Sequence, residues 1–111
     1  MSETAYTFFE NILTSIPEIT PDTIISKTFY SDDQVKVILF GFAPGQELSE
    51  HTASKPAILH FLSGKARLTL GEDSFLAAEG AWVHMPPHLP HSILAETPVT
   101  MLLILLEKGA A

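Results

Sequence analysis

The sequence contains no cysteine, and this absence excludes disulfides, thiolate zinc sites and cysteine nucleophiles. It also lacks a long apolar run. The longest uninterrupted one is Met101 to Leu106, whereas a membrane-spanning helix needs about 20 residues. The N-terminus opens MSETAYTFFE, with an acid and no basic segment, so no signal peptide is visible. We therefore expect no membrane partner, and the cytoplasm is the expected compartment.

Positive charge is scarce as well. Six lysine and arginine residues stand against 13 aspartate and glutamate residues, which gives a formal net charge of −7. The basic residues are scattered along the chain and form no stripe that would follow a phosphate backbone. Nucleic acid is therefore excluded as an expected partner.

The chain does have enough apolar residues for one core. With 111 residues, 46% of them hydrophobic, it collapses rather than staying disordered, and its length predicts one domain over residues 1–111. Turn signals rich in glycine, proline, serine and aspartate recur at short intervals and leave no room for an ordinary helix after residue 22. The segments between them predict strands over 23–30, 35–42, 57–62, 65–70, 82–85, 92–95 and 99–106. This pattern predicts an antiparallel sandwich or barrel. Residues 5–13 fit either a strand or one short helix.

The segment from Val99 to Leu106 is apolar at nearly every position, so both of its faces should be covered. One small open sheet cannot cover both. We infer that two sheets pack face to face, and that a second subunit covers the outer face, which makes a homodimer the expected state.

Two segments that begin at a glycine carry all five histidines, and we expect the chemistry there. They span residues 45–64 and 80–95. Their spacing resembles the two motifs of the cupin superfamily. The matching positions are Gly45, His51 and Gly64 in the first motif, and Gly80, Pro86 and His91 in the second. The resemblance implies an all-β, cupin-type antiparallel barrel, a jelly-roll-like double-stranded β-helix, with a metal or small-molecule site inside.

Four positions depart from the family pattern. They are Ala53 for the second histidine, Ala57 for the glutamate, His88 for the motif-two glycine and Ala95 for the asparagine. Typical members hold one metal with three histidines and that glutamate. The resemblance therefore implies a reduced site in which His51 and His91 remain as metal ligands.

His60 is the expected third ligand, because it is the only histidine on the strand that supplies the glutamate in the family. Strand side chains alternate, so its offset of three from Ala57 puts it on the opposite face unless a β-bulge shifts the register. The same alternation leaves His84 facing either the cavity or away from it, and we keep His84 as a candidate ligand-binding residue. His88, in a proline-rich turn, is expected to be exposed.

Imidazole donors with open positions suit Zn²⁺, Ni²⁺, Cu²⁺ or Fe²⁺. The same pair, His51 and His91, would also suit general acid–base chemistry. We expect a small cupin-barrel protein that binds a divalent metal or a small molecule in the barrel interior, with catalysis left open. A metal-free ligand-binding or sensor cupin, and a barrel that has lost its site, are the alternatives.

Overall fold

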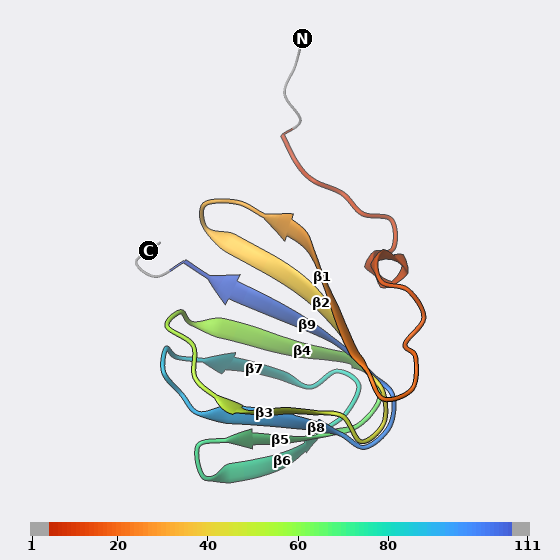
Figure 1. Ribbon diagram of the computed structural model, residues 1–111. Helices are drawn as coiled ribbons and strands as arrows, with labels where there is room; N and C mark the ends of the chain where they lie inside the picture. Colours follow the sequence, from red (N-terminus) through yellow and green to blue (C-terminus); the bar gives the residue numbers. More distant parts are fainter. Residues whose placement is uncertain (1–4, 108–111) are drawn as a thin grey trace.

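The computed structural model describes residues 5–107, and nearly all regular structure in this range is β-strand (Figure 1). The elements are η1 (Ile12–Ser15), β1 (Ile24–Ser31), β2 (Val35–Phe42), β3 (Glu47–His51), β4 (Ala57–Ser63), β5 (Ala66–Leu70), β6 (Asp73–Ala77), β7 (Trp82–Met85), β8 (His91–Ala95) and β9 (Val99–Leu106). All seven predicted strands are present. No helix in this part of the chain is long and apolar enough to cross a membrane.

Two strands were not expected from the sequence, namely β3 and β6. Both are five residues long and mostly exposed. Both also lie at the edges of their sheet, so each pairs on one side only. A short edge strand buries too few side chains to show a clear alternation of apolar and polar residues, and this explains why the sequence pattern missed them.

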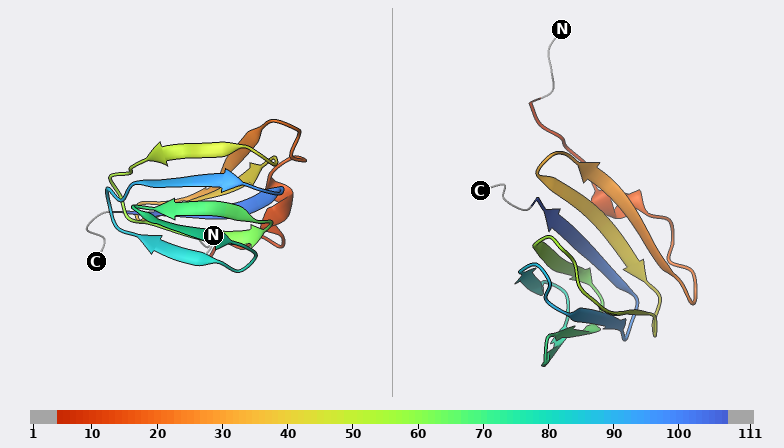
Figure 2. Two further views of the ribbon diagram at one scale, coloured as in Figure 1. Left: turned by 90° about the horizontal axis from the view of Figure 1, so that it is seen from below. Right: turned by 60° about the vertical axis from the view of Figure 1, so that its left-hand side comes forward.

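The strands form two antiparallel sheets. The larger has the order β1-β2-β9-β4-β7 and the smaller the order β3-β8-β5-β6. The smaller sheet lies under β9, β4 and β7, while β1 and β2 extend away from it (Figures 1 and 2). The prediction of an all-β barrel built from two packed sheets is confirmed.

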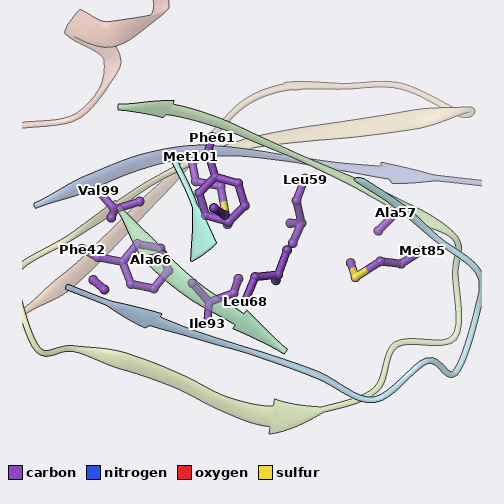
Figure 3. Close-up of a cluster of buried hydrophobic side chains, with 12 residues drawn as sticks. Phe42, Ala57, Leu59, Phe61, Ala66, Leu68, Met85, Ile93, Val99 and Met101 are labelled. Carbon is purple, nitrogen blue, oxygen red and sulfur yellow. The ribbon is translucent and has the colours of Figure 1, made fainter. Parts of the chain in front are cut away.

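The core lies between the two sheets and is made by alternate residues of their strands. On β4, Ala57, Leu59 and Phe61 are buried, and on β9 so are Val99 and Met101. The smaller sheet contributes a facing set, which is Ala66, Leu68, Ala77, Ile93 and Ala95 (Figure 3). Apolar side chains removed from water on both inner faces hold the sheets together, at about 25 cal/mol per Å² of buried apolar surface.

The N-terminal segment covers part of the outer face of the larger sheet. A Cβ added to Gly41 would come within 2.8 Å of Ile19, and within 3.1 Å of Ile16. Leu39, which points to the same side of β2 as Gly41, is fully buried. Residues 12–15 form a single 3-10 turn ahead of this contact, so residues 5–13 form neither a strand nor an ordinary helix.

The outer face of β9 is also apolar. Leu102, Ile104 and Leu106 alternate with the inward residues, and on β4 Ile58 pairs with Ile104 and His60 with Leu102. All five side chains are half-buried within one chain. The expectation that β9 is apolar on both faces is therefore confirmed.

The β1–β2 turn is fixed by Asp32. The Tyr30 hydroxyl donates to its Oδ2 at 2.6 Å, and the amides of Gln34 and Val35 donate to its Oδ1. The bond from Tyr30 is the main cause that lowers the pKa of the Asp32 carboxyl below its ordinary value. The same bond raises the pKa of Tyr30.

The turn glycines give a test of the fold. Gly64 has φ +87°, and a Cβ there would overlap the Pro98 carbonyl oxygen. Gly64→Ala should therefore lower the free energy of unfolding by about 3 kcal/mol, measured by urea denaturation. Gly80→Ala is the matched control, because φ is +93° but nothing lies within 4 Å of the added Cβ. The free energy of unfolding of the Gly80→Ala variant should fall by only about 1 kcal/mol. Equal losses would contradict the close approach at Pro98.

Candidate functional site

An irregularity in β3 places His51 on the same face of the smaller sheet as His91. Leu48 pairs with Ile93 and packs against the core, and three residues later His51 pairs with His91. Three residues on β3 therefore match two on β8, so β3 carries one extra residue. Without this bulge, an offset of three would turn His51 to the face opposite Leu48. The bulge restores His51 to the same face as His91.

The two histidines form a close pair at one end of the smaller sheet. Their ring centroids are 4.2 Å apart and the rings are tilted by 57°. His91 is buried, with 7% of its surface exposed, whereas His51 is exposed. One imidazole is thus buried in the protein, and the other faces solvent.

Each ring is oriented by a backbone carbonyl two residues earlier. Nδ1 of His51 lies 2.8 Å from the Ser49 oxygen, and Nδ1 of His91 lies 2.8 Å from the Leu89 oxygen. A carbonyl only accepts, so Nδ1 carries the proton in both neutral rings and Nε2 keeps its lone pair. Metal-ligating histidines have this arrangement, in which the second ring nitrogen donates to a carbonyl or carboxylate. The sequence offered no signal for these two bonds.

The two missing family ligands leave apolar surface in their place. Ala57 points inward and is 3% exposed, and it pairs with Met85 on β7 and with Leu105 on β9. Ala53 is half-buried, and its carbonyl accepts a hydrogen bond from the amide of His88 at 2.7 Å. Within residues 5–107, no group of three histidine, cysteine, aspartate or glutamate side chains is placed to hold a metal.

The structure does not bring His60 or His84 to the pair. His60 alternates with the buried Leu59 and Phe61, so it lies on the outer face of β4. The only β4 irregularity in its pairing with β9 falls between Phe61 and Ser63, after His60, and leaves its face unchanged. His84 is exposed and pairs with Ile58, an outer-face residue, while its neighbour Met85 is buried. The third ligand expected at His60 has no counterpart in this geometry, because no bulge turns it inward.

His88 is exposed, as expected, and has φ +70°, in the left-handed region. This is the position where the cupin pattern has glycine, and glycine adopts that conformation most readily. His88 therefore adopts a backbone conformation that favours glycine, which is the residue that the cupin pattern has at this position.

The comparisons with known proteins agree with this fold. A family model described as the cupin domain matches residues 38–105, which is more than half of the chain. The chain belongs to the cupin family. The comparison with curated proteins gives no match.

Several solved structures are similar over most of the chain. A cupin superfamily protein from Desulfitobacterium hafniense has 25% sequence identity and a TM-score of 0.80, covering 91% of this chain and 93% of that one. A conserved protein of unknown function from Streptococcus pyogenes has 27% identity and a TM-score of 0.80, covering 98% and 93%. The DMSP lyase DddQ from Ruegeria pomeroyi, at 16% identity and a TM-score of 0.72, covers 81% of this chain and 50% of its own, and shares the fold alone.

The tautomers of the pair can be measured directly. Long-range ¹H–¹⁵N NMR spectra at pH 8 should show Nδ1 as the protonated nitrogen in both His51 and His91, since both donate to carbonyls. His88 is exposed and serves as the reference ring. A proton on Nε2 of either paired histidine would contradict the hydrogen bonds described above.

Proposed function

We propose that this chain binds a divalent transition metal through Nε2 of His51 and His91, and that a small molecule occupies the remaining coordination positions. The observation that supports this most is the orientation of both rings by carbonyls at 2.8 Å from Nδ1, because it leaves the Nε2 lone pair free in two rings whose centroids are 4.2 Å apart. The soft-to-borderline nitrogen donors suit Zn²⁺, Ni²⁺, Cu²⁺ or Fe²⁺.

The donor set fits a weak site, not the full family set. Catalytic zinc sites usually have three protein ligands and one open position, whereas this pair offers two ligands. When bound, the metal would supply Lewis acidity and open positions for oxygen or nitrogen atoms of a ligand. The protein's own part would be to hold the buried His91 in place through the Leu89 carbonyl and to leave the exposed His51 accessible to a small molecule.

Calorimetric titration with Ni²⁺ or Zn²⁺ tests the metal site. Wild-type protein should bind about one ion per chain, with a Kd in the micromolar range or weaker because only two protein ligands are present. His51→Ala and His91→Ala should each weaken binding at least about tenfold. His60→Ala and His88→Ala are matched controls, because both side chains lie away from the pair, and they should bind as wild type does.

Acid should weaken this binding, because protons compete with the metal for Nε2. The titration repeated at pH 7.5 and pH 5.5 should show a clear loss of affinity at the lower value. Binding that survives both histidine replacements, or that disappears with His60→Ala, would place the metal elsewhere and refute the assignment.

A metal-free ligand pocket is the second candidate function. It is favoured by the buried Ala57 methyl and the adjoining Met85, which put apolar surface where the family places a charged ligand. In that case, His51 and His91 would contact a small molecule directly by hydrogen bonds. Absence of any metal binding in the titration would select this function over the first.

We also propose that the chain forms a homodimer through the outer face of the larger sheet. The proposal rests on the half-buried apolar side chains on the outer face of β9 and β4. Ile104 lies at the centre of this face, between Val37 on β2 and Ile58 on β4. Such a face is stabilised when a second copy covers it.

Sedimentation at micromolar concentration should show a dimer of the 12.1 kDa chain. Ile104→Lys should shift the protein to the monomer. Leu76→Lys should not, because Leu76 is exposed on the smaller sheet. Circular dichroism of both variants separates dissociation from unfolding, and a folded wild-type monomer would refute the dimer.

A further inference from the structure

A second feature of the molecule lies apart from the histidine pair. It is a pocket of about 350 Å³ between the edge strands of the two sheets, β6 and β7, which do not pair with each other. Its lining residues are all apolar in their side-chain bodies, and they are Phe61, Leu68, Leu70, Phe75, Leu76, Ala77, Ala81, Trp82 and Val83. The volume falls in the lower part of the range for small-molecule sites.

Three of the lining residues are large and unusually exposed. Phe75, Leu76 and Trp82 are 50%, 54% and 60% exposed. Scattered apolar residues at a surface need no explanation, but these three surround one hollow. None of the lining side chains carries a charge. The pocket is therefore suited to hydrocarbon.

The strand register connects this pocket to the histidine pair. His51 pairs with His91, His91 with Leu70, and Leu70 with Asp73, so the four residues form one row across the smaller sheet. Leu70 lines the pocket. Neighbouring strands are about 4.8 Å apart, so the pocket begins one strand away from His91.

The same row of residues indicates at which end of the pocket the polar group of a ligand would lie. Asp73 lies on the far side of Leu70 from His91, and it is exposed. A negatively charged head group would be repelled there. At His91 and His51, it would meet imidazole nitrogens and, under the proposed function, a divalent cation.

We infer that the ligand of this barrel is a small amphiphilic carboxylic acid. Its aliphatic or aromatic body lies in the pocket between β6 and β7, and its carboxylate reaches the His51–His91 pair. The head-group half of this assignment rests on the proposed metal site, whereas the hydrocarbon half rests on the pocket alone.

Trp82 provides the readout, because it lines the pocket and is the one tryptophan of the sequence. Titration of its fluorescence with butanoate, hexanoate and octanoate, with and without Zn²⁺, should show saturable binding. Affinity should rise about fourfold for each added methylene, as expected for burial of hydrocarbon. Addition of Zn²⁺ should tighten binding of the acids and leave binding of 1-hexanol and 1-octanol unchanged.

Variants separate the two halves of the assignment. Phe75→Ala should flatten the dependence on chain length, and Phe8→Ala, at an exposed phenylalanine outside the pocket, should not. Ala81→Leu gives an independent second test. Ala81 lies in the connection between β6 and β7, and the larger side chain should fill the pocket and weaken binding of the longer acids. His91→Ala should remove the effect of Zn²⁺ on the acids while leaving the chain-length dependence of the alcohols intact.

The outcomes distinguish this inference from the proposed function. Metal binding by calorimetry together with no chain-length dependence would overturn the inference and leave the metal site standing. Chain-length dependence without any effect of Zn²⁺ or His91→Ala would support the hydrocarbon half and overturn the head-group assignment, while the calorimetric titration alone decides the metal site. A third outcome is that Trp82 fluorescence changes with protein concentration in the absence of any acid, with acid binding lost at high protein concentration. That result would show that a second copy fills the pocket and would overturn the inference.

Discussion

The contact between the inner faces of the two sheets is the interaction on which the rest of the structure depends. Phe42, Phe61 and Met101 of the larger sheet pack against Leu68 and Ile93 of the smaller one, and all five are almost fully buried. With no disulfide available, this apolar contact holds the two sheets together, while the backbone hydrogen bonds of the ladders set the register of the strands. Everything placed on those strands, including the histidines, takes its position from it.

The candidate site depends on one extra residue in β3. The bulge turns His51 to the face of His91, and the carbonyls of Ser49 and Leu89 orient the two rings alike. The same strands fix what the site lacks, because Ala57 presents only a methyl group to the interior. The weak metal binding and the hydrophobic recognition proposed above both rest on this arrangement of two imidazoles, an apolar wall and the apolar pocket beyond Leu70.

The long strands and the two motifs could be predicted from local sequence. β2, β7 and β9 have the predicted bounds, because each is apolar enough to show its period and is bounded by turn residues. The glycines at 64 and 80 adopt the positive φ expected of turn glycines, and His88 takes over the left-handed position of the missing one. The pairing of His51 and His91 followed from the resemblance to the cupin family, since no local rule connects residues 40 positions apart. The homodimer and the cytoplasmic location stay predictions.

By itself, the sequence determined the all-β class, the absence of thiols and the two apolar faces of β9, and it singled out His51 and His91, which the structure places side by side. Only the tertiary structure decided the faces of His60 and His84, because alternation fixes a side chain relative to its neighbours and not relative to the core. It also decided the edge strands β3 and β6 and the bulge that aims His51, since these arise from pairing with β8 and β5. The pocket between β6 and β7 has the same origin. It exists where two sheet edges come together without pairing, and no short stretch of sequence encodes such a gap.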